Sequence, residues 1–102
     1  MSVLEVARLR VRAGSEDAFE DAFEQAARIL RSAEGQLGVD LTRVIVTSRE
    51  QGEYLLLAAW RSLEDHVPGF TQSAQFATFF ALLGPHLAGE PQVNHYEQLE
   101  AL

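Results

Sequence analysis

The segment EYLLLAAW, residues 53–60, constrains the fold of this chain more than any other, because it is apolar on both faces of a strand. Side chains alternate in direction along a strand, so Leu55 and Leu56 lie on opposite faces, and each face continues in leucine, alanine or tryptophan. A strand of this kind has to be covered on both sides. We therefore expect residues 53–60 to lie inside a sheet that has a packed layer on each face.

The residues before this strand predict a strand, a helix and a second strand. Residues 3–12 alternate between apolar and charged side chains, with three arginines on one face. Ser15 then begins an amphipathic helix, whose apolar side chains recur every three or four residues until Gly35 can end it. Residues 37–48 are rich in β-branched side chains, and we expect them to pair with residues 53–60 as a hairpin.

The residues after it predict two helices and a last strand. Ser62 begins a short helix that Pro68 and Gly69 stop, and Ser73 begins another that runs to Gly84. Residues 91–99 form the final strand. The order βαββαβ predicts an α+β fold of the ferredoxin-like kind, with a four-stranded antiparallel sheet and both helices on one face.

One face of such a sheet has no helix on it, although the central strand is apolar there as well. A second copy of the chain would cover this face in the simplest way, so we expect a homodimer formed through the sheet faces. The length of 102 residues fits a single domain, residues 1–102.

Composition excludes several classes of function. The chain has no cysteine and no lysine, and a net charge of −7 disfavours nucleic acid as a partner. No apolar run approaches the ~20 residues that a membrane span needs, and Met1 leads directly into a strand pattern, so we expect a cytoplasmic protein with no membrane partner. The histidines are too far apart in sequence to suggest a metal site.

Two histidines are the candidate general bases, because an unperturbed imidazole titrates near pH ~6.5. His66 could take up a substrate proton or only hydrogen-bond the carbonyls that end a short helix; His95 could be a second base or a core or interface residue. An anion formed in the reaction could be stabilised by Arg43, by Tyr54 or by the indole of Trp60, which could also be a core residue.

Three sequence stretches resemble the antibiotic biosynthesis monooxygenase family: the helix FEDAFEQAARILRSAEGQLGV, the strand YLLLAAWRSLEDH, and the later Phe70, Ser73 and Phe76. The resemblance covers nearly the whole chain. It implies a dimeric α+β barrel with a pocket between each sheet and its helices. In such a fold the substrate-binding residues would include Leu56, Phe70, Phe76 and Phe80.

The resemblance implies two chemistries that can be compared by residue. Quinone-forming members use a tryptophan, a tyrosine six residues later and an asparagine; the matching positions hold Trp60, His66 and Leu56. Haem-degrading members use a histidine, a tryptophan and an asparagine; the matching positions hold Phe80, Phe70 and Ala7, which argues against haem oxygenation.

The leading hypothesis is a monooxygenase that needs no cofactor and oxidises an aromatic or quinol-like small molecule with O2. An electron-rich phenol can itself pass an electron to oxygen once a base has removed its proton, so a base, an anion donor and a dry pocket suffice. The alternative is a dimeric binding or accessory module that holds a hydrophobic metabolite without turnover.

Overall fold

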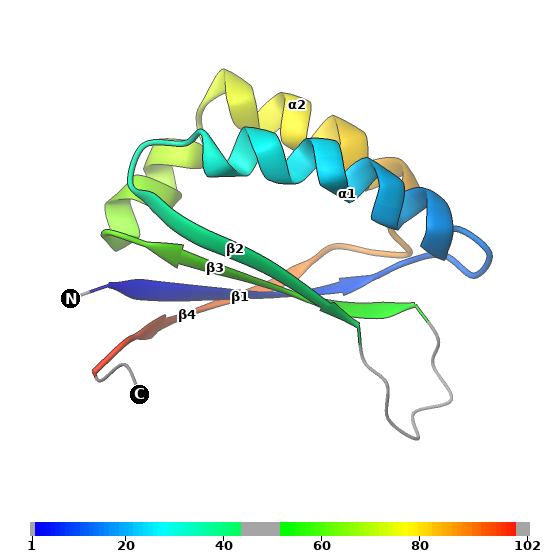
Figure 1. Cartoon of the computed structure of the whole chain (residues 1–102), viewed down its shortest axis with the longest axis horizontal. Coiled ribbons are helices and arrows are strands. Elements are labelled where there is room, and N and C mark those ends of the chain that lie inside the picture. The colour runs from blue at the N-terminus through cyan, green and yellow to red at the C-terminus, as the bar shows by residue number, and fades with distance from the viewer. Residues whose placement is uncertain (1, 44–51, 100–102) are drawn as a thin grey trace.

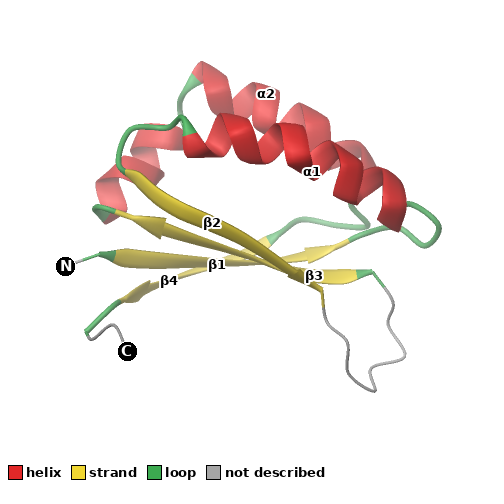
Figure 2. Ribbon diagram, viewed as in Figure 1, coloured by secondary structure: helices red, strands yellow, loops and turns green. Residues whose placement is uncertain are grey.

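The chain folds into one sheet layer and one helix layer (Figure 1), in a computed structural model that describes residues 2–43 and 52–99. The sheet order is β2-β3-β1-β4 with antiparallel neighbours, and both long helices cover the same face (Figure 2). The ferredoxin-like α+β prediction is therefore confirmed. The strands and helices are β1 (Val3–Arg10), α1 (Glu16–Arg31), β2 (Gln36–Arg43), β3 (Glu53–Trp60), α2 (Ala74–Leu83) and β4 (Gln92–Glu97).

The strand ends differ slightly from the predicted ones. β1 stops at Arg10, and Val11 forms only an isolated bridge to Leu87, whose carbonyl also accepts a hydrogen bond from Nε of Arg12 at 3.1 Å. The strand predicted over residues 37–48 is observed as far as Arg43, and the remainder lies outside the described residues.

The helix α1 begins where its sequence predicts, although its first turn is held differently, and it ends at Arg31, earlier than predicted. Ser15 occupies the N-cap position, but its side chain makes no capping bond; the carboxylate of Glu16 instead accepts from the backbone N–H of Gly14 at 2.7 Å. At the other end the C-cap is Ser32, not Gly35 as predicted. Gly35 has φ +79°, a left-handed conformation that suits glycine, in the turn that follows, where the N–H of Gln36 donates to the carbonyl of Ala33 at 3.2 Å. The apolar stripe of α1 is buried against the sheet through Phe19, Phe23, Ala26, Ala27 and Leu30.

The segment after β3 contains the predicted helix stop and a wide turn that the sequence did not predict. Ser62 does begin a turn, since its hydroxyl accepts from the backbone N–H of Asp65 at 3.2 Å and donates to the Asp65 carboxylate at 2.9 Å. The helix stops at Val67, whose φ of −126° and ψ of 111° are not helical, directly before Pro68, as predicted. A wide turn follows within the segment η1 (Asp65–Phe70), and it is closed by the N–H of Thr71, which donates to the carbonyl of His66 at 3.0 Å. Such wide turns change the direction of side chains and are common at functional sites.

The helix α2 is capped as predicted, because the hydroxyl of Ser73 accepts from the backbone N–H of Phe76 at 3.2 Å. Gly84 and Pro85 end the α-helix, and the chain makes one further turn of 3₁₀ helix, η2 (Gly84–His86), before it reaches β4. Since α2 carries phenylalanines on several sides, it supplies much of the wall above β1 and β4.

The two faces of β3 have different environments. The face under the helices is buried through Tyr54, Leu56, Ala58 and Trp60. Leu55, Leu57 and Ala59 lie on the opposite face and are only half-buried, and no described element covers that face (Figure 1). The sequence predicts a packed layer on both faces of β3, and the described residues provide one only on the face under the helices.

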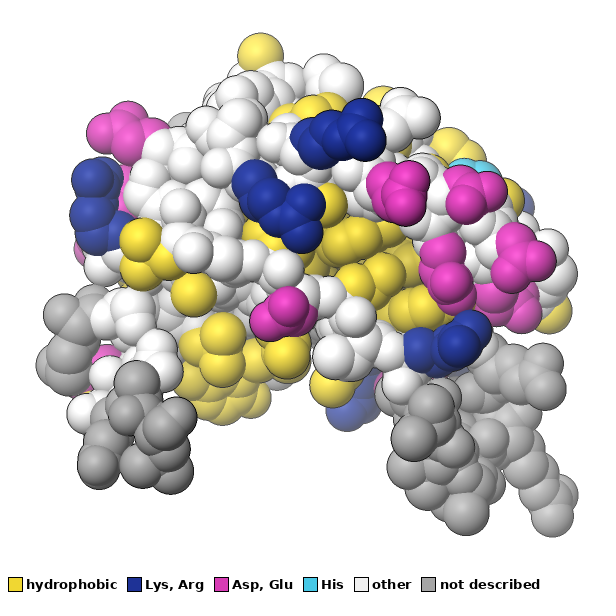
Figure 3. All heavy atoms as spheres, in the orientation of Figure 1, with side chains coloured by type: hydrophobic (Ala, Val, Ile, Leu, Met, Phe, Trp, Pro, Cys, Tyr) yellow, Lys and Arg dark blue, Asp and Glu magenta, His cyan; other side chains and the backbone are white. Residues whose placement is uncertain are grey.

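The surface is charged unevenly. Carboxylates gather over the first turns of α1 (Figure 3), from Glu16, Asp17, Glu20, Asp21 and Glu24. Among the described residues, no helix is both long enough and apolar enough to cross a membrane.

Candidate functional site

A cavity of about 250 Å³ lies between α2 and the part of the sheet formed by β1 and β4. Most of its lining is apolar, and aromatic rings from η1 and α2 form one wall: Phe70, Phe76, Phe79 and Phe80. The polar side chains in the lining are Glu5, His66, Thr71 and His95. The cavity is thus a small apolar chamber with polar groups at a few positions, which is the usual composition of a small-molecule site.

Glu5 is buried in this chamber, with only 5% of its surface exposed. It has the same strand phase as Ala7 and Leu9, so the pleat of β1 directs all three side chains toward the helices. The antiparallel pairing of β1 with β4 places Glu5 directly opposite His95. Sequence reasoning missed Glu5, although a detectable signal was present: a carboxylate in phase with the apolar face of a strand.

His66 is also 5% exposed, and both of its ring nitrogens have side-chain partners. Nδ1 lies 2.7 Å from Nε2 of His95, and Nε2 lies 3.3 Å from Oε1 of Glu5. The alternative in which the ring of His66 binds helix-end carbonyls is therefore wrong. The wide turn η1 gives the reason, because it directs His66 inward between β1 and β4.

Trp60 lies behind these residues and does not line the cavity, so its predicted role as a direct substrate contact needs correction. It is fully buried, its Nε1–H donates to Oε1 of Glu5 at 3.0 Å, and its ring stacks on that of His66 with centroids 4.9 Å apart. The last position of β3 places the indole under the helices, where its one donor is already used. Trp60 supports both Glu5 and His66 from the side away from the cavity.

Burial favours the uncharged forms of the two innermost groups. It raises the pKa of Glu5 above its usual value, and the hydrogen bond from Trp60 offsets part of that shift. Burial also lowers the pKa of His66 to about 4, with a smaller contribution from the neighbouring His95. His66 is therefore neutral at physiological pH, and one of its nitrogens is available as an acceptor.

Glu5, His66 and His95 are metal-ligand residue types, but their geometry does not suit a shared ion. Glu5 approaches Nε2 of His66, whereas His95 approaches Nδ1 on the other side of the ring. One ion cannot contact both nitrogens of one imidazole. Consistently, no group of three potential ligand residues in residues 2–43 and 52–99 is placed to hold a metal.

The structure brings most of the predicted site residues together. His66, His95, Leu56, Phe70, Phe76 and Phe80 all line the cavity. Ala7, Phe70 and Phe80, which match the haem-degrading positions, line it as well and present only apolar side chains there. These three positions offer no ligand for haem iron.

Arg43 and Tyr54 are separated from this group, which corrects their predicted place in the pocket. They pair with each other at the end of the β2–β3 ladder that lies away from Trp60. Both bind Glu20 on α1, through a contact of 3.3 Å from Arg43 Nη1 and one of 2.5 Å from the Tyr54 hydroxyl. Burial, followed by Glu20, raises the pKa of Tyr54 to about 12, so its phenol stays protonated.

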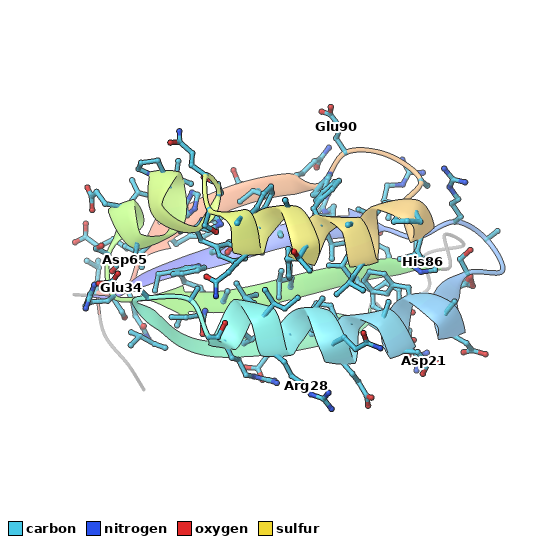
Figure 4. All side chains as sticks on the ribbon, turned by 90° about the horizontal axis from the view of Figure 1, so that it is seen from above. Asp21, Arg28, Glu34, Asp65, His86 and Glu90 are labelled. Atoms are coloured by element: carbon cyan, nitrogen blue, oxygen red, sulfur yellow. The ribbon has the colours of Figure 1, made fainter. Side chains whose placement is uncertain are left out.

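The third histidine, His86, lies outside the site. In Figure 4, Asp65 and Glu34 lie together at one end of the molecule, where Arg61 contacts both carboxylates, whereas His86 lies near the other end. His66 directly follows Asp65, so His86 cannot join the pair formed by His66 and His95.

Comparison with known proteins places this site in a family. The sequence profile described as "Antibiotic biosynthesis monooxygenase" matches residues 2–82. The chain belongs to the antibiotic biosynthesis monooxygenase family. The Bacillus subtilis protein YczJ, itself uncharacterised, is 37% identical over 97 residues, which span 95% of this chain and 99% of YczJ.

Solved structures share the same fold. A Bordetella bronchiseptica protein assigned to the antibiotic biosynthesis monooxygenases is 32% identical, with a TM-score of 0.89 over 97% of this chain and 98% of that one. SnoaB of Streptomyces nogalater, described as a cofactor-independent oxygenase and solved as a mutant, has a TM-score of 0.77 over 99% and 96% of the two chains. At 17% identity, SnoaB supports the fold alone.

Proposed function

We propose that this protein is a cofactor-independent monooxygenase that oxidises a small phenolic or enolisable aromatic compound with O2. One observation carries the proposal: the hydrogen-bonded pair of His66 and His95 lines a cavity whose other walls are mainly apolar. A pair of imidazoles next to bound substrate can act as a general base.

The chemistry needs only substrate, oxygen and a base. Removal of the hydroxyl proton produces an electron-rich anion, which passes one electron to O2; the two radicals then combine at a ring carbon that carries hydrogen. Loss of water from the resulting peroxide leaves a carbonyl group. In the overall reaction of 1-naphthol, one oxygen atom enters the ring as the quinone carbonyl and the other leaves as water. The substrate supplies all four electrons, so no external reductant is needed.

The cavity supports a compact and uncharged substrate. Its volume of about 250 Å³ lies just below the ~300–1,000 Å³ of pockets for drug-sized ligands, which corresponds to a compound of two or three fused rings. No arginine is among the described residues that line it. A substrate carboxylate or phosphate would enter this chamber without a cationic partner, at a high cost in desolvation.

Family membership supports the same reaction class. SnoaB, which has this fold, is described as a cofactor-independent oxygenase, and the Bordetella bronchiseptica relative is assigned to the same family. The sheet face opposite the helices supports a homodimer, because Leu4, Val6, Leu55 and Leu57 form an apolar patch there. Two copies joined through this face would each keep their own cavity under α2.

Oxygen consumption tests the proposal. Purified protein, treated with chelator, is assayed with anthrone and 1-naphthol in an oxygen electrode while quinone formation is followed by absorbance. We expect His95→Ala to lower kcat/KM at least tenfold, a difference of ~1.4 kcal/mol in barrier, and His86→Ala to leave it unchanged because His86 lies outside the cavity. Binding of these compounds without oxygen uptake by the native protein would favour the binding-module alternative instead.

A further inference from the structure

We propose that Glu5 is the final acceptor of the substrate proton, at the inner end of a relay that runs through His95 and His66. The inference rests on the proposed function and deepens it, because it assigns the direction of proton movement and the atom that receives the proton. It begins from the arrangement of three side chains from three separate elements: Glu5 on β1, His66 on η1 and His95 on β4.

The carboxylate of Glu5 sets the direction of the hydrogen bonds. An ionised carboxylate has no proton to donate, so it favours the tautomer in which the proton is on Nε2 of His66, the nitrogen that lies 3.3 Å from Oε1. Nδ1 of His66 is then an acceptor, and Nε2 of His95 must donate to it across 2.7 Å. The remaining nitrogen, Nδ1 of His95, is left as an acceptor, and it has no partner among the described residues. A substrate hydroxyl can bind at this atom.

Proton transfer along this chain is balanced at each residue. The substrate hydroxyl gives its proton to Nδ1 of His95, Nε2 of His95 gives a proton to Nδ1 of His66, and Nε2 of His66 gives a proton to Oε1 of Glu5. Each imidazole gains one proton and loses one, so neither becomes an imidazolium. The negative charge moves from Glu5 to the substrate oxygen, where it promotes the reaction with O2.

The surroundings of the three side chains favour this outcome. Burial disfavours both an imidazolium at His66 and a carboxylate at Glu5, so a proton that reaches this corner is held best as the carboxylic acid. Among the described residues, no other titratable side chain from the packed elements lines the cavity. The carboxylate of Asp65, the residue next to His66, is engaged by Arg61 at 2.9 Å and by Ser62 at 2.9 Å.

Trp60 is a positioning residue in this arrangement. Its Nε1–H holds Oε1 of Glu5 at 3.0 Å, the same oxygen that faces His66. Its ring covers one face of the His66 imidazole. These two contacts keep the accepting oxygen and the donating nitrogen aligned while leaving the cavity side of His95 free for substrate.

The relay is tested in ligand-free protein by following which ring nitrogen of His66 carries its proton, with ¹⁵N-labelled histidine and NMR between pH 9 and pH 5. We expect the proton on Nε2 at pH 9 and on Nδ1 once Glu5 is protonated, with His95 switching in step. Glu5→Gln keeps an oxygen for Trp60 and His66 but takes up no proton, so its His66 should stay in the Nε2–H form. Glu97→Gln, an exposed carboxylate on β4, is the matched control and should switch like the native protein.

A second readout separates the relay from the proposed function. Without oxygen, absorbance reports how much bound 1-naphthol is ionised; we expect at least a tenfold smaller ionised fraction in Glu5→Gln than in the native protein. Tautomer switching without naphthol binding would support the relay and overturn the proposed function. Naphthol that binds and ionises equally in Glu5→Gln, or a native His66 that becomes an imidazolium without switching, would overturn the relay.

Discussion

Trp60 shows how a single residue can be decisive without touching a ligand. Its indole N–H donates to a buried carboxylate, and its ring is the support on which His66 lies. Trp60→Phe keeps an aromatic ring but removes the indole N–H that donates to Oε1 of Glu5. We expect this variant to lower the free energy of unfolding by about 2 kcal/mol, the typical effect of leaving a buried polar group without its hydrogen-bond partner. Urea denaturation measures it.

The matched variant for this measurement is Tyr96→Phe, which removes a polar atom from an exposed aromatic residue on the same sheet. Its free energy of unfolding should stay within about 0.5 kcal/mol of the native value. Equal losses in the two variants would mean that the hydrogen bond between Trp60 and Glu5 contributes little.

The buried imidazole of His66 makes stability depend on pH. The unfolded chain takes up a proton near the usual pKa of 6.5, whereas folded His66 does so only near 4, so stability falls as pH decreases from 6.5 to 4. We expect a loss of about 1–2 kcal/mol over this range. His66→Asn lacks this titration.

The raised pKa of Glu5 affects stability in the opposite direction, because its contribution is lost as pH rises. Glu5 titrates in both the native protein and His66→Asn, so the difference between the two proteins reports the titration of His66. The stability of the native protein relative to His66→Asn should decrease as pH falls through the window, as measured by urea denaturation at several pH values. A difference that stays constant from pH 7 to pH 4 would contradict the assignment.

At the scale of an element, the two helix starts offer a matched pair of serines. Ser73 accepts the backbone N–H of Phe76, whereas Ser15 occupies the same N-cap position on α1 without a side-chain capping bond. We expect Ser73→Ala to destabilise the protein by ~1 kcal/mol and Ser15→Ala by a few tenths at most. Thermal unfolding of both variants tests this, and similar losses would show that the capping bond of Ser73 contributes little.

The wide turn η1 is the element on which the site depends most. The helix breaks at Val67, directly before Pro68 as the sequence pattern predicts, but the chain then closes a wide turn in place of leaving the ring of His66 at a free helix end. The observed turn continues to Phe70 and buries both His66 and Phe70. Since a side chain's direction follows from backbone geometry that spans several residues, a proline alone could not reveal it.

At the scale of the whole molecule, the half-buried sheet face predicts assembly. Leu57 lies beside Val6 on this face, and a charge placed there would have to be desolvated in a dimer but stays solvated in a monomer. We expect Leu57→Asp to convert a dimer into a folded monomer, measured by analytical ultracentrifugation and circular dichroism. Leu63→Asp, at an exposed position beyond the end of β3, should remain dimeric. A native protein that sediments as a monomer would contradict the sheet-to-sheet dimer.

The sequence by itself determined the order of elements, the starts of both helices and the apolar strand at the centre, because these depend on spacings of a few residues around Ser15, Ser73 and residues 53–60. Only the tertiary structure decided what surrounds the cavity. Glu5 and His95 meet because antiparallel register places them opposite each other, and Arg43 is removed from the site by the same kind of pairing. Which residues lie opposite each other depends on contacts between strands far apart in the chain, so the sequence pattern of one strand does not reveal its partners.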